Sequence, residues 1–255
     1  MGLGGLDINN DGNIDGNNSP LYWAVYQGNM ELVRFFVEQG ASLKGALHAA
    51  CSSHTFRPGS GDALAMISYL LEQGMDIDGF HYQMNNVYCT PLHSAILDCY
   101  VGDHCLTVIK YLILRGADKH KLNPTTGETL VHAAVTWTGY RSLVPILEYL
   151  HEEGLDLNKV DNNQTSPLQH VMESCNGKEQ YLLMTIRFLV EHGADVNHPK
   201  PNPVANPYLN NRGGSPPLIQ ACSKHYPDVC RFLVDHGADV NQVLACGACY
   251  HHDYL

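Results

Sequence analysis

The feature that most restricts how this chain folds is a short phrase that recurs along nearly all of its 255 residues. The phrase starts with glycine, and its most regular copies are Gly-Ala-Asp-Val-Asn at 193–197 and 237–241. Successive copies are 35, 34, 42, 38, 39 and 44 residues apart, with their glycines at positions 5, 40, 74, 116, 154, 193 and 237. Self-similarity at such a period predicts a stack of small units rather than one globular core.

A second phrase alternates with the first and predicts a helix. Its clearest copy is Thr-Pro-Leu-His at 90–93. A Thr or Ser hydroxyl caps free amide groups, and proline suits the first helical position. Small residues follow at one spacing, at positions 24, 50, 95, 134, 171 and 221, which lets a neighbouring helix approach closely. A second apolar-periodic stretch precedes each glycine, which ends it in the left-handed conformation. The predicted unit is helix, turn, helix, glycine stop and loop.

The two phrases together resemble the ankyrin repeat family, on Thr-Pro-Leu-His at 90–93, Leu-His-Ala-Ala at 47–50 and the Gly-Ala-Asp-Val-Asn copies. The resemblance covers residues 5–242, about six repeats. It implies an all-α repeat fold, a solenoid of helix-turn-helix units with β-hairpin or loop fingers. We expect a cap or finger at 1–18 and a tail or cap at 243–255. The expected repeats are 19–43, 44–79, 90–119, 127–158, 164–197 and 214–242.

The fingers and helix connections differ in length between repeats. Almost no finger fits between Gly40 and Leu47, whereas 79–89 and 198–215 are enlarged. The missing finger beside an aromatic one suggests a notch in the groove, as a hypothesis. Insertions within helix pairs are expected at 52–62, 99–105, 138–141 and 175–181. Long loops are often functional, but length drift costs little stability, so both explanations stay open.

The family resemblance implies that partners dock on the finger tips and on the exposed ends of the first helix of each pair. Large rigid side chains dominate interface energetics, which favours the aromatic residues at those places as anchors. The alternative is that Trp137 packs under the insertion after it and that Tyr88 anchors its own loop. The candidate partner-binding residues are Tyr26, Tyr82, Tyr88, Asp98, Trp137 and Glu173.

The charge balance is acidic, with 15 Lys and Arg against 26 Asp and Glu, a formal net charge of −11. Nucleic-acid binding needs clustered Lys and Arg, so no nucleic-acid partner is expected. Acidic residues recur in the fingers, as at Asp76, Asp156 and Asp161, which favours a basic or amphipathic peptide partner. A merely solvated surface is the alternative. Apolar runs are too short to span a bilayer, and neither a membrane partner nor a signal peptide is expected.

Three sets of residues invite a chemical interpretation. The stretch 7–18 resembles a calcium loop, but its twelfth position is Asn18 rather than Glu. The terminal cluster Cys246, Cys249, His251 and His252 has zinc-ligand chemistry but no second half to enclose an ion. His48, His93 and His132 occupy the position where the family resemblance implies a ring bonded to finger backbone. We therefore predict no metal site and no cofactor.

The sequence leaves three functional hypotheses. The first is a monomeric, non-enzymatic protein-interaction module or adaptor, which the resemblance implies. The second is an enzyme or small-molecule binder that uses the notch, the long loops and His, Tyr or Asp side chains, although no catalytic motif is present. The third is an adaptor domain cut from a larger chain. The nine scattered cysteines indicate reduced thiols and the cytoplasm, with the nucleus as the alternative compartment. Cys51 and Cys222 occupy equivalent repeat positions and are expected to be packing residues.

Overall fold

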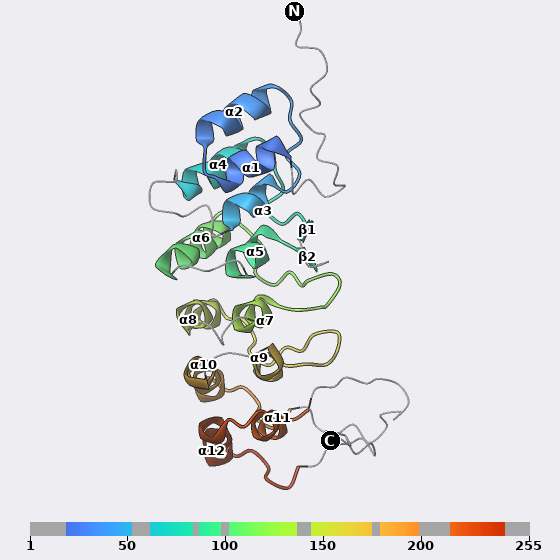
Figure 1. The fold of residues 1–255 in the computed structure, drawn as a ribbon, viewed down its shortest axis with the longest axis vertical. Coiled ribbons are helices and arrows are strands. Elements are labelled where there is room, and N and C mark those ends of the chain that lie inside the picture. The colour runs from blue at the N-terminus through green and yellow to red at the C-terminus, as the bar shows by residue number, and fades with distance from the viewer. Residues whose placement is uncertain are drawn as a thin grey trace, which may run out of the picture. The chain divides into compact units, whose positions relative to one another are not determined.

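The computed structural model describes residues 19–52, 62–83, 87–97, 102–136, 144–174, 179–198 and 215–242. These residues form six helix pairs and one hairpin (Figure 1). The expected segments 1–18 and 243–255 lie outside the described residues. The pairs are α1 Pro20–Tyr26 with α2 Met30–Glu38, α3 Ala46–Cys51 with α4 Ala63–Glu72, α5 Pro91–Leu97 with α6 Gly102–Leu114, α7 Leu130–Val135 with α8 Val144–Glu152, α9 Pro167–Ser174 with α10 Glu179–Glu191, and α11 Pro217–Ser223 with α12 Pro227–Asp235.

The chain divides into two compact units, residues 1–125 and 126–255. In the first unit, α1 contacts α3, and α3 contacts α5, so the first helices of the pairs form one row. In the second unit, α7, α9 and α11 form the corresponding row, and α8, α10 and α12 form a second row beside it (Figure 1). Each unit is thus a stack in which a helix pair packs on its neighbours.

Helices begin where the sequence places capping residues. The Ser19 hydroxyl accepts a hydrogen bond from the Tyr22 amide at 3.0 Å, and Pro20 takes the first helical position. The Thr129 hydroxyl accepts from the His132 amide, while the Thr129 amide donates to His132 Nδ1. This reciprocal pair is a capping box in which histidine replaces the usual Glu or Gln.

Helices of the second row end at the recurring glycines. Gly40, with φ +81°, donates to the Val37 carbonyl, and Ala41 donates to the Phe36 carbonyl. These two bonds form the motif that closes a helix through a left-handed residue. Nothing lies within 4 Å of where a Gly40 side chain would start, so backbone conformation rather than space requires glycine there.

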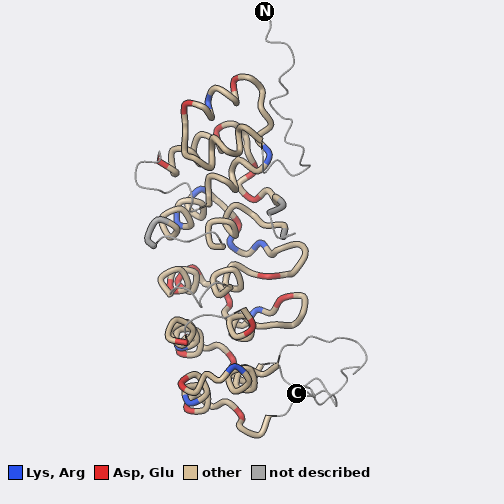
Figure 2. The backbone as a smooth tube through the Cα atoms, in the orientation of Figure 1, with Lys and Arg blue, Asp and Glu red and all other residues tan. Residues whose placement is uncertain are grey.

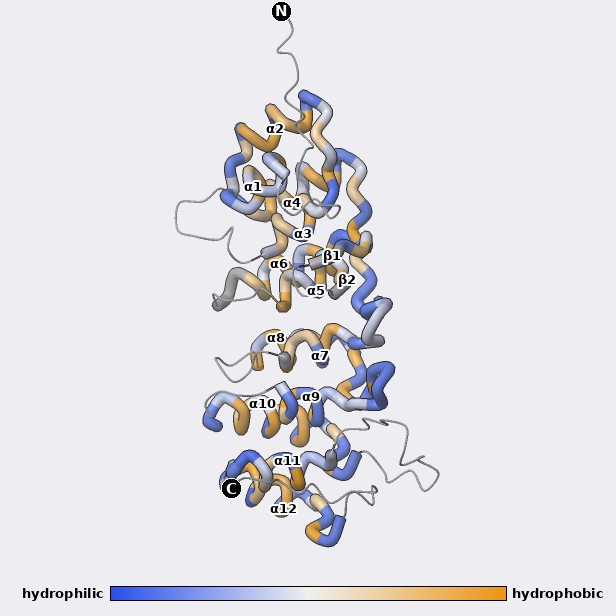
Figure 3. Tube along the Cα trace, turned by 45° about the vertical axis from the view of Figure 1, so that its right-hand side comes forward, coloured by the Kyte–Doolittle hydropathy of each residue, from blue (hydrophilic) through white to orange (hydrophobic). Residues whose placement is uncertain are grey.

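The core consists of leucines and small residues from the second phrase. Leu47, Leu92, Val131 and Leu168 are fully buried, and the predicted small residues three positions later, at 50, 95, 134 and 171, are buried with them. Hydropathy follows the same division, because the helices are mainly hydrophobic and the loops between helix pairs mainly hydrophilic (Figure 3). Small buried side chains permit the close helix approach that the sequence predicted.

The enlarged finger forms a hairpin, β1 His81–Gln83 paired antiparallel with β2 Val87–Cys89. His48 Nε2 donates to the Cys89 carbonyl at 2.8 Å and so joins the second helix pair to the hairpin. The His81 ring lies against Gly45, whose φ is +73° and where a side-chain carbon would collide with the ring. His81 therefore occupies space beside the short 41–45 loop, which argues against an empty notch at that point.

The Asp and Asn of the glycine phrase have separate structural tasks. Asp195 Oδ1 accepts from the Asn197 amide within its own turn. Asn197 then bonds the next repeat, since its Oδ1 accepts from the Asp239 amide at 2.8 Å and its Nδ2 donates to the Gly237 carbonyl at 2.9 Å. The finger-start aspartates that make the chain acidic are thus also turn-forming residues.

Three expectations need correction. Helix α6 begins at Gly102 and α10 at Glu179, so the predicted insertions 99–105 and 175–181 are partly helical. Cys105 is disulfide-bonded, so the expectation of a fully reduced chain is wrong. Cys222 is exposed, although its repeat position matches that of buried Cys51 and predicted a packing residue.

No described helix is long and apolar enough to cross a membrane.

Candidate functional site

The predicted binding residues fall into three groups. Tyr26, Tyr88 and Glu173 are described with their side chains. Tyr82 has a described backbone, paired with Tyr88 across the hairpin. The remainder lie outside the described residues: Asp98, Trp137, Cys246, Cys249, His251 and His252.

In the first unit, Tyr26 belongs to an aromatic cluster on α1. Its ring stacks on Tyr22 at a centroid distance of 6.1 Å and meets Trp23 edge-on at 5.4 Å. Trp23 is 44% exposed, and Tyr88 on the hairpin is 45% exposed. Both are therefore open to a partner. The sequence reasoning missed Trp23, although its spacing of three residues from Tyr26 places both on one helix face.

In the second unit, His132 is a structural residue. It is fully buried, and its Nε2 donates to the Thr165 carbonyl at 3.0 Å while its Nδ1 faces the Thr129 cap. Burial lowers the pKa of His132 despite that carbonyl bond. The ring therefore stays neutral with both nitrogens engaged, which makes it a poor general base. His48 has the same bonding to a finger carbonyl, as the resemblance implied.

The next repeat has glutamine at this histidine position. Gln169 is fully buried, its Oε1 accepts from the Ser166 amide at 3.0 Å, and its Nε2 donates towards the Ser215 carbonyl at 3.4 Å. The amide thus makes the same two kinds of contact as the ring of His132. Because Gln169 performs the structural task, the adjacent His170 is left for another role.

His170 lies between Thr136 and Glu128. The Thr136 hydroxyl donates to the His132 carbonyl at 2.9 Å, so its oxygen accepts from His170 Nε2 at 3.2 Å. The other ring nitrogen, Nδ1, faces Glu128 Oε1 at 3.9 Å. Burial lowers the pKa of His170, so the ring is neutral at pH 7 and Nδ1 offers a lone pair beside the carboxylate.

Two further carboxyl groups, those of Asp161 and Glu173, belong to the surroundings of Glu128 and His170. Asp161 is buried, and its Oδ1 accepts from the Asn163 and Thr165 amides at 2.8 Å each. Burial, opposed by the Thr126 hydroxyl and His132 and reinforced by Asp161, raises the pKa of Glu128. Partial burial of its carboxyl, and then Asp161, raises the pKa of Glu173, which Gln220 and Lys224 partly offset, although the Glu173 residue as a whole is exposed. Glu128, Asp161, His170 and Glu173 are called the acidic cluster below.

Lys224, the basic residue that acts on the Glu173 carboxyl, is already engaged. Its ammonium group donates to the backbone carbonyls of Met172 at 2.7 Å and Glu173 at 3.1 Å, where it caps the end of α9. In the described finger loops of the second unit, Asp and Glu outnumber Lys and Arg, whereas both signs occur in those of the first unit (Figure 2). The acidic cluster is therefore suited to a further cation supplied from outside.

The arrangement suits a basic side chain better than a metal ion. Among the described residues, no three His, Cys, Asp or Glu side chains are placed to hold a metal together. A Lys or Arg head group has several donors that reach carboxylates and a histidine lone pair lying apart. Sequence reasoning singles out Glu173 and Asp161 and places His170 one position out of phase, because Gln169 holds the histidine position, but it misses Glu128.

Family models match most of the chain. The model described as ankyrin repeats in three copies matches residues 97–200 and 140–243, and the single ankyrin repeat model matches residues 16–45. The two overlapping matches alone span more than half of the chain. No curated protein sequence matches it.

Solved ankyrin repeat domains share the fold at low sequence identity. That of Bcl-3, described as a unique member of the IkappaB protein family, has a TM-score of 0.59 at 24% identity, covering 89% of this chain and 90% of its own. The ankyrin repeat domain of human ASB11 has a TM-score of 0.61 at 22% identity, covering 88% of this chain and 86% of its own. An ankyrin repeat domain from Acinetobacter baumannii AYE has a TM-score of 0.56 at 20% identity, covering 86% of this chain and 98% of its own. The chain belongs to the ankyrin repeat family.

Proposed function

We propose that this protein is an interaction module that binds a basic segment of a partner protein, with the acidic cluster of the second unit as its principal contact. Ankyrin repeat domains are in general protein-interaction modules. The observation that supports the specific proposal is that the pKa values of Glu128 and Glu173 are both raised, by burial and by the negative charge of buried Asp161. These two effects disfavour the charged carboxylates, and a cation from a partner relieves the second of them.

The partner is a peptide segment rather than a small ion. One Lys or Arg takes the place beside Glu128 and His170, and neighbouring residues contact the exposed ends of α9 and α11. In the first unit, Trp23, Tyr26 and Tyr88 form a separate candidate surface, with aromatic contact area of the kind that dominates interfaces. The protein acts without catalysis, as an adaptor in the cytoplasm.

The test uses a random peptide library displayed to the full chain. Retained peptides are compared between the wild type and the double variant Glu128→Gln, Glu173→Gln. We expect wild type to enrich Lys and Arg, and its best peptides to bind the variant about tenfold more weakly, which corresponds to about 1.4 kcal/mol. Binding constants are measured by calorimetry.

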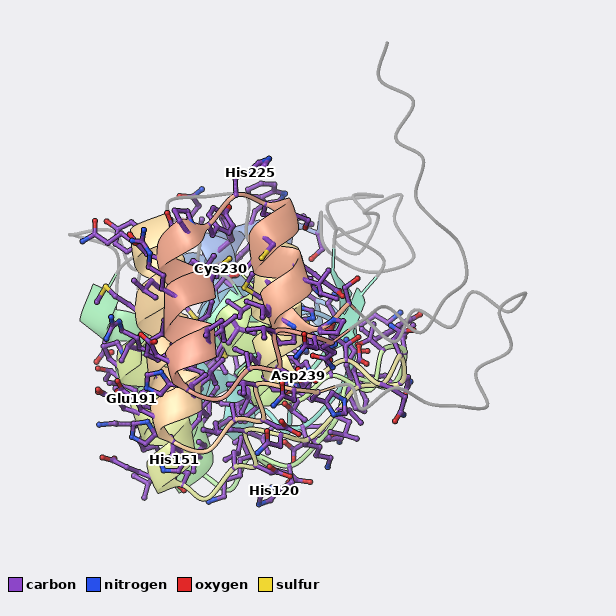
Figure 4. The ribbon with its side chains drawn as sticks, turned by 90° about the horizontal axis from the view of Figure 1, so that it is seen from below. His120, His151, Glu191, His225, Cys230 and Asp239 are labelled. Atoms are coloured by element: carbon purple, nitrogen blue, oxygen red, sulfur yellow. The ribbon has the colours of Figure 1, made fainter. Side chains whose placement is uncertain are left out.

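The matched control removes the same two charges elsewhere in the second unit. Glu152 and Glu191 are exposed residues near the ends of α8 and α10 in the second row, and Figure 4 labels Glu191. The double variant Glu152→Gln, Glu191→Gln should bind the selected peptides as wild type does. Equal weakening of binding in both double variants would mean that net charge, and not the acidic cluster, causes the effect. Selected peptides without enrichment in Lys and Arg would contradict the proposal.

A further inference from the structure

We propose that Cys222 and Cys230 are a site of reversible oxidation, at which a small-molecule disulfide converts the two thiols into one disulfide that links α11 to α12. Both are free thiols on the two helices of one pair. The inference is independent of peptide binding. It concerns the last described repeat, whose two helices face the viewer in Figure 4, with Cys230 labelled between them and His225 at their turn.

The geometry favours a direct link. The two sulfur atoms lie 3.4 Å apart and are within hydrogen-bonding distance. A disulfide bond is about 2.05 Å long, so the sulfurs need to approach by only about 1.4 Å. Side-chain rotation on two packed helices provides a movement of that size without unfolding either helix.

Access distinguishes this pair from the other described free thiols. Cys222 is exposed and Cys230 is half-buried, whereas Cys51 and Cys89 are each 1% exposed. Cys51 occupies the same repeat position as Cys222, but it lies inside the first unit. Cys222 is therefore the sulfur that an oxidant in solution reaches first.

The acid–base properties assign different roles to the two sulfurs. Burial, with the neighbouring Cys222 and Glu179 adding to it, raises the pKa of Cys230 to about 11. Cys230 therefore keeps its proton near neutral pH, and its sulfur lies within hydrogen-bonding distance of the Cys222 sulfur. The thiolate is the form that attacks disulfides, so exposed Cys222 makes the first attack and Cys230 the second.

The reaction then proceeds in two exchange steps. The Cys222 thiolate attacks glutathione disulfide, forms a mixed disulfide and releases one glutathione thiolate, which takes up a proton. Cys230 loses its proton and attacks the Cys222 sulfur, which expels the second glutathione. Two protein thiols are oxidised to one disulfide and one glutathione disulfide is reduced to two glutathione molecules, so atoms and electrons balance.

Peptide mapping tests the proposal directly, because trypsin separates the two cysteines. Cleavage after Arg212, Lys224 and Arg231 places Cys222 alone in 213–224 and Cys230 alone in 225–231. The full chain is reduced, equilibrated with glutathione buffers of defined ratio, acid-quenched, alkylated and digested. We expect the two peptides to appear joined by a disulfide that dithiothreitol removes.

Preorganisation provides a second measurement. The equilibrium constant for the link should be at least about tenfold larger in the native chain than in the same chain in about 8 M urea. Cys51→Ser is the matched control and should leave the linked peptides unchanged, whereas Cys222→Ser and Cys230→Ser should each abolish them. A stable glutathione adduct on Cys222 without the link would overturn the proposal, as would pairing with the peptide 232–255, which contains Cys246 and Cys249.

Discussion

At the scale of single residues, one structural task is performed by two different side chains. His48 and His132 donate a ring hydrogen to a finger carbonyl, and Gln169 uses its amide nitrogen for the same kind of contact. Glutamine keeps the donor but has no ionisable group in this range. A glutamine in place of a buried histidine therefore keeps the hydrogen bond but removes the group that can take up a proton.

Replacing His48 with glutamine should therefore remove a pH dependence. Burial lowers the pKa of His48 to about 3, below the value of about 6.5 expected in an unfolded chain. The unfolded state then binds the extra proton, so the stabilisation is complete above pH 6.5 and is lost as the pH falls towards 3. Between pH 7 and pH 5, His48 should lower the free energy of unfolding of the first unit by about 2 kcal/mol. The variant His48→Gln should not show this loss.

This loss is measurable by urea unfolding of the first unit. Trp23 reports on that unit in a Trp137→Phe background, since the chain has only these two tryptophans. The exposed His120 provides the control His120→Gln, which should retain the full pH dependence. If His48→Gln and wild type lose the same stability at pH 5, burial of a neutral His48 is not its cause.

At the scale of elements, the helix pairs were predictable and the finger contacts were not. Capping residues, proline and glycine stops act within a few residues, so the sequence alone located the six pairs and their small core residues. Contacts such as His81 on Gly45 join positions 36 residues apart in the chain. The acidic cluster likewise combines residues from two loops and from helix α9. A local sequence pattern does not show which of these side chains meet.

Gly127 illustrates such a contact and supports a prediction. Its φ is +74°, and a side-chain carbon there would collide with both the side chain and the backbone nitrogen of Asn162. The same loops are joined by the Asn162 amide, which donates to the Thr126 carbonyl at 2.9 Å. Gly127→Ala should therefore destabilise the second unit by about 2–3 kcal/mol, from backbone strain and the collision together. It should also weaken peptide binding, because Glu128 is the next residue.

Gly154 is the matched control for this substitution. It also has a positive φ, +82°, but nothing lies within 4 Å of a side-chain carbon placed there. Gly154→Ala should cost only about 1 kcal/mol, the strain part of the effect. Hydrogen exchange of the α7 and α9 amides gives both values, and equal losses in the two variants would show that the loop collision has no effect.

At the scale of the whole molecule, the net charge of −11 affects how partners arrive rather than how the chain folds. Exposed charges on the finger turns attract a basic segment over a distance set by salt, about 10 Å at 0.1 M and about 3 Å at 1 M. Contacts with Glu128 and Asp161 inside the acidic cluster are less screened, because Glu128 is half-buried and Asp161 is buried. Long-range attraction and local contact should therefore respond differently to ionic strength.

This difference leads to a kinetic prediction for a basic peptide selected by the wild-type chain. Raising NaCl from about 0.1 M to about 1 M should slow association by about tenfold, with a smaller change in dissociation. Glu128→Gln should do the opposite and mainly accelerate dissociation, because it removes a partly buried partner of the bound cation. Stopped-flow fluorescence resolves the two rates, and the same peptide with glutamine at each basic position is the control. A salt effect confined to dissociation would mean that the acidic surface does not steer the partner, and would leave the cluster as the only electrostatic contribution to binding.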